Sequence, residues 1–184
     1  MPAARFVDAL NHQIGNELAA HSQYLACAVH YDAETMPQMA SFFYAQALEE
    51  RDHAMMMVQY LLDTDADVTI PGVEAPQTSF ADVVAPVALA LDQERRVTEQ
   101  INSLLRIARE EHDFASEQFL QWFIKEQVEE VATMTDLLTV VTRNADDLED
   151  IEEYVAREAG GESADPTAPR SEEHTSELQS PCNL

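Results

Sequence analysis

Four long stretches of helical periodicity, with one long interruption between the second and the third, constrain the fold more than any other feature of this sequence. The pattern predicts helices over residues 2–31, 36–63, 80–110 and 113–143, and a shorter helix over 145–158. The first and third connections are only a few residues long, so each joins antiparallel neighbours. The interruption at 65–79 contains Pro71, Gly72 and Pro76, which are typical of a loop.

This interruption is long enough to cross the whole molecule. About fifteen extended residues span roughly 50 Å at about 3.3 Å each. A helix over 36–63 is about 42 Å long at 1.5 Å per residue. The loop can therefore return along the bundle, which makes the second and third helices parallel. The expected fold is all-α: a four-helix bundle with one long crossover connection and a short fifth helix near the C-terminus.

The charge of the chain is strongly acidic, with 35 Asp and Glu residues against 10 Lys and Arg and a formal net charge of -25. We expect no nucleic-acid partner and no membrane partner, because nucleic acids and anionic membrane surfaces repel an acidic protein. The acidity fits attraction of cations, and it fits a solubility or salt adaptation equally well. The chain shows neither an apolar run of transmembrane length nor a signal-peptide pattern, so a cytoplasmic location is expected.

The C-terminal region differs in character from the rest. We expect one domain over residues 1–160 and a flexible tail over 161–184, where helical periodicity is lost. From Arg170 the sequence RSEEHTSELQS resembles the in-frame translation of a sequencing adapter. We therefore interpret 170–184 as a gene-assembly artefact and exclude it, with Cys182, from functional reasoning. The other cysteine, Cys27, is expected to be a buried free thiol.

Each of the four long helical stretches carries one glutamate in its otherwise apolar stripe, close to the middle of the stretch: Glu17, Glu50, Glu94 and Glu130. In a crossover bundle these midpoints fall in one layer. His53 follows Glu50 by three residues and shares its helix face. Any one of these acids alone would tilt to solvent or pair with an arginine. Four at one level, together with a histidine, indicate a shared site.

The charge of this layer indicates what fills it. Four ionised glutamates balance two divalent cations, and without metal the carboxylates repel one another and have raised pKa values. Oxygen ligands with one imidazole suit iron or manganese, while the lack of thiolates argues against a structural zinc site. Glu50, beside His53, is the expected bridge between two metals, and Gln127 adds a neutral ligand or hydrogen-bonding group.

The same residues resemble the motifs of a known family. Over residues 1 to about 160 the chain is similar to the non-haem bacterial ferritins, members of the ferritin-like di-iron carboxylate family. The similarity lies in Glu17 with Tyr24, in the run EERDH at 49–53, in Glu94, and in the run EQVEE at 126–130. It implies that Glu17, Glu50 and His53 hold one iron and that Glu50, Glu94 and Glu130 hold the second.

The resemblance also assigns roles around the two irons. It implies a third iron site, formed by Glu49, Glu126 and Glu129, that moves iron between the centre and the cavity. Without the resemblance, these three acids read as a solvated face. Tyr24 would hydrogen-bond ligands or supply an electron, and Gln127 would lie beside the second iron.

The departures from related families are informative. Bacterioferritins carry a second Glu-x-x-His motif where this chain has Gln127 and Glu130, and a haem-ligating methionine where it has Arg51. We therefore expect no haem. The single motif also argues against rubrerythrin-like peroxidases and di-iron oxygenases. Of two acids that often line iron-access channels in ferritins, Glu117 matches one and Leu120 replaces the other.

By this resemblance the chain is an iron-storage ferritin with ferroxidase activity. Fe(II) would be oxidised by O2 or H2O2 at the mid-bundle centre and stored as a mineral in a hollow shell of 24 subunits. The alternatives are a di-iron peroxide scavenger that stores no mineral, and a structural or metal-buffering bundle whose acids bind cations passively.

Overall fold

The computed structural model describes residues 1–158 and 167–170. It contains five helices in this part of the chain: α1 (Ala4–Ala33), α2 (Pro37–Asp63), α3 (Ala85–Glu110), α4 (Phe114–Arg143) and α5 (Leu148–Glu158). The expected all-α bundle is confirmed. The expected tail and the adapter-like segment lie outside the described residues, apart from 167–170.

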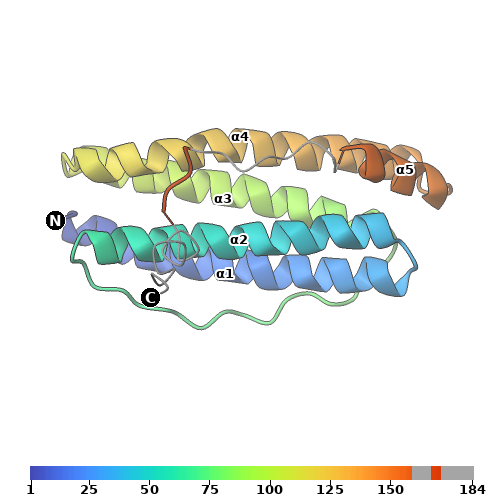
Figure 1. Ribbon diagram of the computed structural model, residues 1–184, viewed down its shortest axis with the longest axis horizontal. Helices are drawn as coiled ribbons and strands as arrows, with labels where there is room; N and C mark the ends of the chain where they lie inside the picture. The colour runs from blue at the N-terminus through green and yellow to red at the C-terminus, as the bar shows by residue number, and fades with distance from the viewer. Residues whose placement is uncertain (159–166, 171–184) are drawn as a thin grey trace, which may run out of the picture.

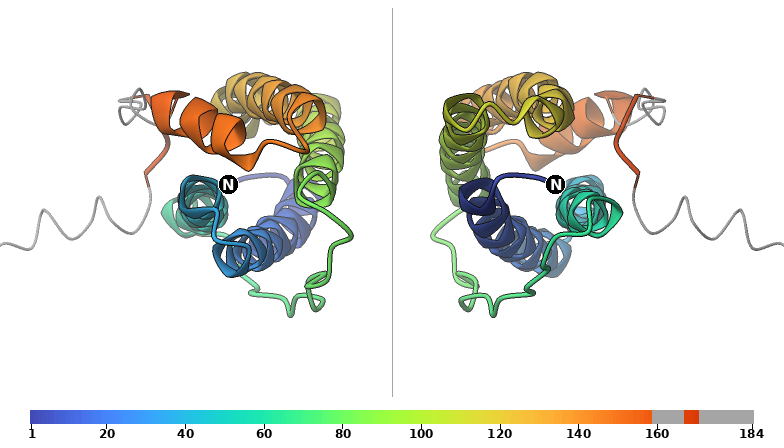
Figure 2. Two further views of the ribbon diagram at one scale, coloured as in Figure 1. Left: turned by 90° about the vertical axis from the view of Figure 1, so that its right-hand side faces the viewer. Right: turned by 90° about the vertical axis from the view of Figure 1, so that its left-hand side faces the viewer.

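The four long helices form two antiparallel pairs, α1 with α2 and α3 with α4 (Figure 1). The connection between α2 and α3 runs along the side of the bundle, so that these two helices are parallel, as the loop length predicts (Figure 1). Views along the axis show the four helices around a common centre, with α5 beside the end at which α2 begins (Figure 2). No helix in the described part is long and apolar enough to span a membrane.

Two helices begin three or more residues later than the periodicity predicts. The predicted start of the third helix at Phe80 is wrong, since α3 begins at Ala85. The carboxylate of Asp82 accepts the N–H groups of Val84 and Ala85 at 3.0 and 2.9 Å, which fixes a turn ahead of the helix. Likewise α5 begins at residue 148 rather than 145.

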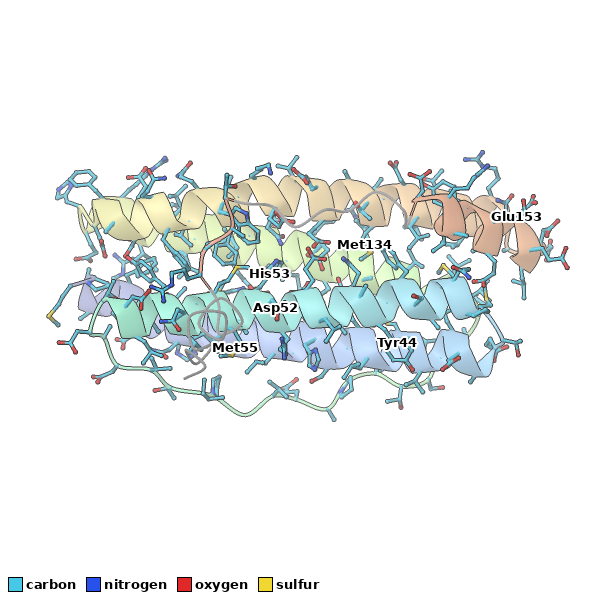
Figure 3. All side chains as sticks on the ribbon, in the orientation of Figure 1. Tyr44, Asp52, His53, Met55, Met134 and Glu153 are labelled. Atoms are coloured by element: carbon cyan, nitrogen blue, oxygen red, sulfur yellow. The ribbon has the colours of Figure 1, made fainter. Side chains whose placement is uncertain are left out.

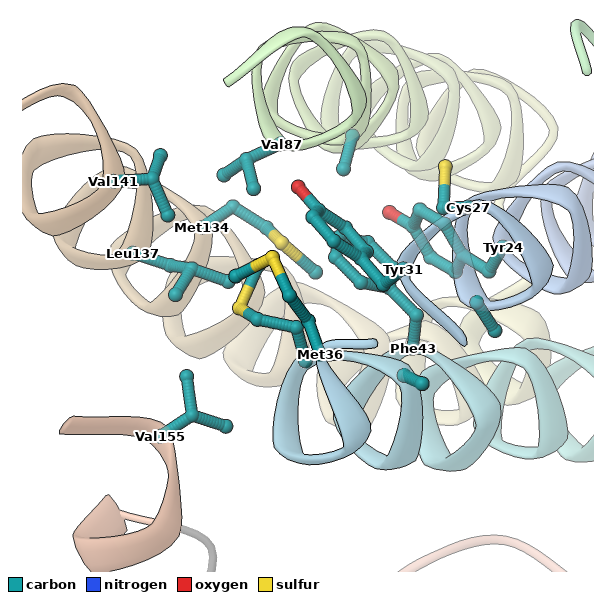
Figure 4. Packing of buried hydrophobic residues seen from close by; sticks show 14 of the residues in the cluster. Tyr24, Cys27, Tyr31, Met36, Phe43, Val87, Met134, Leu137, Val141 and Val155 are labelled. Carbon is teal, nitrogen blue, oxygen red and sulfur yellow. The ribbon is translucent and has the colours of Figure 1, made fainter. Parts of the chain in front are cut away.

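Two clusters of buried apolar side chains form the core, and the four mid-helix glutamates separate them. On α1, Ile14 belongs to one cluster and Tyr24 to the other, and Glu17 lies between them. The same alternation occurs on the other three long helices. Figure 4 shows the cluster nearer α5, where Tyr31 stacks on Phe43 with ring centroids 5.5 Å apart. The glutamates therefore occupy a polar layer enclosed by apolar packing on both sides.

The fifth helix is attached to α2 by a carboxylate as well as by apolar contacts. Glu152 accepts the N–H groups of Gln38 and Met39 at 2.8 and 2.9 Å. These N–H groups belong to the first turn of α2 and have no partner within the helix. Ile151 and Val155 of α5 are buried beside them. The position of α5 is thus tied to the start of the helix that carries Glu50 and His53.

The crossover is attached to α1 by two amide side chains. Asn11 donates to the carbonyl of Asp67 at 2.9 Å and accepts the N–H of Thr69 at 2.6 Å. Further along α1, the amide of Gln23 donates to the carbonyl of Gln77 at 2.9 Å and accepts the N–H of Gln77 at 2.8 Å. Each amide therefore imitates one rung of a β-ladder and holds the crossover in register along α1.

Gly15 lies between these two attachments, and a side chain there should displace the crossover. A Cβ atom on Gly15 would lie 2.6 Å from Cγ of Pro71, which is closer than carbon atoms approach. We expect Gly15→Ala to destabilise the protein by about 1–3 kcal/mol through overpacking, despite a helix-propensity gain of about 1 kcal/mol. Thermal unfolding measures this difference.

Two further variants check the cause. Gly72→Ala is the matched control, because a Cβ atom there meets nothing within 4 Å. The double variant Gly15→Ala/Pro71→Ala should recover most of the lost stability. An equal melting temperature for Gly15→Ala and wild type would contradict the contact.

Candidate metal centre

The residues singled out in the sequence lie together in the polar layer. The side chains of Glu17, Glu50, His53, Glu94 and Glu130 are each at most 5% exposed. They come from all four long helices, and Figure 3 shows His53 inside the bundle. Burial of four carboxyl groups among apolar neighbours is unfavourable unless something compensates their charge.

One set of ligand atoms comes from α1 and α2. Glu17, Glu50 and His53 each offer an atom within 4.8 Å of the other two. Nδ1 of His53 lies 3.5 Å from Oε2 of Glu50. Oε2 of Glu17, Oε2 of Glu50 and Nε2 of His53 are buried without a hydrogen-bond partner. Buried polar atoms are normally satisfied, so unsatisfied atoms on all three side chains of this group fit a bound cation.

Glu94 is held by hydrogen bonds instead. Tyr24 donates its hydroxyl to Oε1 of Glu94, and Gln127 donates its amide to Oε2 at 3.5 Å. The amide of Gln127 is oriented in turn by Thr98, whose hydroxyl donates to Oε1 of Gln127 at 2.9 Å. Tyr24 and Gln127 therefore fix the carboxylate of Glu94 from two different helices.

The electrostatics of the layer favour neutral carboxyl groups when no metal is bound. Burial raises the pKa of Glu17 to about 7. Burial also raises the pKa of Glu50 well above its usual range, and the charges of Glu94, Glu17 and Glu130 add to this shift. The pKa of Glu94 is raised by burial as well. Glu50 is thus the carboxyl group whose pKa is raised by the charges of all three others.

Burial changes the pKa of the His53 imidazole in the opposite direction from that of the glutamates. Burial lowers its pKa to about 4, so the ring is neutral at pH 7 and keeps a lone pair for a metal. The rings of Trp122 and Phe123 pack edge-on against it, with centroids 5.5 and 5.8 Å away. This packing fixes the plane of the imidazole and excludes water from one side of the centre.

A second set of acids lies next to the first. Glu49, Glu126 and Glu130 each offer an oxygen within 4.8 Å of the others. The resemblance names Glu129 in this set, but the structure groups Glu130 with Glu49 and Glu126. Glu129 is exposed, and its Oε1 lies 3.5 Å from Nζ of Lys125. The role of Glu129 stays a prediction.

Four further residues, Cys27, His21, Glu117 and Leu120, have structural explanations. Cys27 is buried and free, as expected, and burial raises its pKa to about 12. Nδ1 of His21 lies 2.6 Å from the carbonyl oxygen of Ala47 and is satisfied there. Leu120 is fully buried in the core, and the carboxylate of Glu117 lies 2.8 Å from Nε of Arg109.

The comparisons with known proteins agree with this geometry. Residues 7–144 match the ferritin-like domain, which is three quarters of the chain. The chain belongs to the ferritin family. Ferritin BfrB of Mycolicibacterium smegmatis is 54% identical over 166 residues, covering 90% of this chain and 92% of that protein.

More distant ferritins are similar as well. The bacterial non-heme ferritin of Staphylococcus aureus (strain MRSA252) is 36% identical over 147 residues, covering 80% of this chain and 89% of that protein. An open pore ferritin from the archaeon Archaeoglobus fulgidus superposes with a TM-score of 0.82 at 28% identity, covering 87% of this chain and 99% of that one.

Reasoning from the sequence missed Gln13, which contacts a carboxylate of this ferritin's polar layer directly. Gln13 is buried and donates its amide to Oε1 of Glu17 at 2.8 Å. The sequence signal for this contact was the spacing of Gln13 and Glu17, because residues four apart lie on the same face of a helix. A glutamine within a helix is nevertheless so common that its spacing alone indicates nothing.

Proposed function

We propose that this ferritin stores iron, and that its polar layer is a di-iron ferroxidase centre. The observation that carries the proposal is the grouping of Glu17, Glu50 and His53, which bring ligand atoms within 4.8 Å of one another and each have a buried polar atom without a hydrogen-bond partner. Membership in the ferritin family supports iron as the cation. The oxygen-rich donor set with one neutral imidazole is suited to iron.

The carboxylates divide the work of binding two Fe(II) ions. Glu17, Glu50 and His53 bind the first ion, and Glu50, Glu94 and Glu130 bind the second. Glu50 would belong to both sets, as the family resemblance implies, and the charges of the other three carboxyl groups all raise its pKa, which supports a central position. Tyr24 and Gln127 hold Glu94 in place, and Tyr24 would supply an additional electron, as the family resemblance implies.

The reaction needs the protein for position and charge. Each Fe(II) gives up one electron, and the pair reduces O2 to H2O2, or H2O2 to water, with protons taken from solvent. The four carboxylates neutralise the substrate ions, and the aromatic wall of Trp122 and Phe123 keeps bulk water away. Glu49 and Glu126, next to Glu130, form with Glu129 the route by which Fe(III) leaves for the mineral.

Storage requires a closed space, which one subunit cannot provide. We propose that the chain self-assembles into a hollow homo-oligomeric shell, of 24 subunits by the family resemblance, in the cytoplasm. The alternative is a di-iron peroxide scavenger with the same centre and no mineral. The two differ in what happens to iron after oxidation.

A single experiment separates these functions. Fe(II) is added in air to the metal-free protein at many equivalents per subunit, and the product is analysed by size exclusion with iron detection. We expect rapid oxidation and iron that co-elutes with a large shell. Oxidised iron that precipitates outside the protein would favour the scavenger, and oxidation at the protein-free rate would contradict a ferroxidase centre altogether.

A further inference from the structure

Gln13 is a buried amide with every hydrogen-bonding group engaged. It is 2% exposed, and its Nε2 donates to Oε1 of Glu17 at 2.8 Å and to Oε1 of Gln100 at 3.1 Å. Its own Oε1 accepts the amide of Asn16 at 2.9 Å. These bonds fix the direction of the amide, because a flipped amide would place its oxygen against two other acceptor oxygens.

The two carboxylate oxygens of Glu17 differ in consequence. Oε1 is held by Gln13, whereas Oε2 is buried without a partner. Glu17 also offers one oxygen to the group that it forms with Glu50 and His53. A hydrogen bond to one oxygen restricts rotation of the carboxylate, so the remaining oxygen keeps a fixed direction.

This arrangement parallels the treatment of Glu94 on the other side of the layer. Tyr24 and Gln127 fix Glu94, and the hydroxyl of Thr98 orients Gln127. Gln13 fixes Glu17, and Gln100 and Asn16 orient Gln13. Both carboxylates are thus supported by an amide that is itself locked by a further polar group.

Gln13 also lies beside a groove, so its side chain separates Glu17 from that groove. A groove of about 510 Å³ between α1 and α3 is lined by Gln13 and Gln100, together with His12, Arg96 and Glu99. Gln13 therefore stands between this groove and the carboxylate of Glu17. An apolar side chain in its place would leave Oε1 of Glu17 free to turn or to accept water from the groove.

We propose that Gln13 is a positioning residue of the metal centre. Its amide holds Oε1 of Glu17 so that the other oxygen is presented to the metal shared with Glu50 and His53. The inference rests on the proposed function only in taking Glu17 as a metal ligand. Loss of an outer hydrogen bond to a metal ligand typically weakens metal binding about 10- to 100-fold.

The test measures metal binding without iron chemistry. Gln13→Met keeps the length of the side chain and removes its donor, while Gln100→Met removes the neighbouring bond and leaves the bond to Glu17. Co(II) is titrated anaerobically into each metal-free protein, with affinity from calorimetry and geometry from the visible spectrum. We expect Gln13→Met to bind one Co(II) about 10- to 100-fold more weakly with an altered spectrum. Gln100→Met should lose clearly less affinity, because Asn16 still orients the amide of Gln13 and the bond to Glu17 remains.

Two outcomes would overturn the proposal. One is wild-type affinity and spectrum in Gln13→Met, and the other is an equal loss in Gln100→Met, which would indicate general packing between α1 and α3. Far-UV circular dichroism and size exclusion verify that each variant is folded. If Gln13→Met does not assemble, Gln13→Leu replaces it, and undiminished Co(II) affinity in that variant would refute the role equally.

The result is independent of whether the protein stores iron. If wild type binds Co(II) but oxidises no Fe(II), the proposed function fails, while the comparison of Gln13→Met with Gln100→Met still decides the role of Gln13.

Discussion

Glu50→Gln is expected to abolish rapid Fe(II) oxidation and, in the same protein, to raise the stability of the metal-free state. The loss follows because the amide cannot bridge two cations, and we expect the initial rate to fall at least ~100-fold, the upper end of what even outer-shell substitutions cause. The gain follows because Glu50 is a buried carboxyl group whose pKa is raised well above its usual range by burial and by Glu94.

The sign of the stability change depends on pH. A carboxyl group with a raised pKa in the folded state stabilises the protein fully at low pH and loses that contribution as pH rises. Glutamine does not titrate, so the melting temperature of Glu50→Gln should exceed that of wild type at pH 8, and the excess should shrink towards pH 4.5. Each kcal/mol corresponds to about 2–4 °C in a chain of this size.

Opposite changes in rate and stability distinguish this variant from a damaged one. Glu99→Gln is the matched control, since it removes the same charge from an exposed position on α3 and should change neither quantity. Size exclusion should show an unchanged assembly. A Glu50→Gln protein that oxidises Fe(II) at the wild-type rate would refute the bridging role.

Metal affinity should fall steeply as the pH falls from 7 to 6. Cations displace protons from the layer, and the pKa of Glu17 is raised to about 7, with that of Glu50 also raised. Each displaced proton weakens binding up to about tenfold per pH unit, so two together predict roughly 50-fold. His53 adds no proton in this range, because burial lowers its pKa to about 4.

Calorimetry of anaerobic Co(II) binding in buffers of different ionisation enthalpy counts these protons directly. We expect between one and two protons to be released at pH 7 when the two metal ions of one centre bind. The metal-free protein should become more stable over the same interval as the pH decreases, because Glu17 is protonated when folded and ionised when unfolded between pH 4.5 and 7. Affinity that is constant across this range would contradict buried, protonated carboxyl groups.

The sequence was sufficient for the parts of this molecule that repeat with a helical period. The midpoint glutamates could be assigned to one layer because helix lengths and the crossover length determine which levels coincide. The start of α3 could not be predicted in this way. It depends on the Asp82 carboxylate, which accepts two N–H groups ahead of the helix, and such an interaction has no periodic signature. Periodicity continues through such a cap without a break.

In the polar layer, too, some residues could be predicted from the periodic pattern, while others depend on side-chain contacts that the pattern does not show. Glu17 and His53 stand out as charged or polar groups in apolar stripes, so their burial was predictable. Gln13 and Thr98 do not stand out, because their roles depend on which oxygen of a neighbour they contact. The placement of Glu130, rather than Glu129, beside Glu49 and Glu126 similarly depends on side-chain direction across two helices.

The enclosed polar layer also has a consequence for the departure of iron. In the proposed centre, four carboxylates would cancel the charge of two Fe(II) ions, and oxidation would add two positive charges that none of these four carboxylates compensates. An uncompensated charge in a dry enclosure is unfavourable, whichever sign it has. The burial that makes the empty layer receptive to Fe(II) therefore makes the same layer a poor resting place for Fe(III). If the proposed function holds, Fe(II) enters by displacing protons from neutral carboxyl groups, and the excess positive charge left after oxidation favours departure of the product.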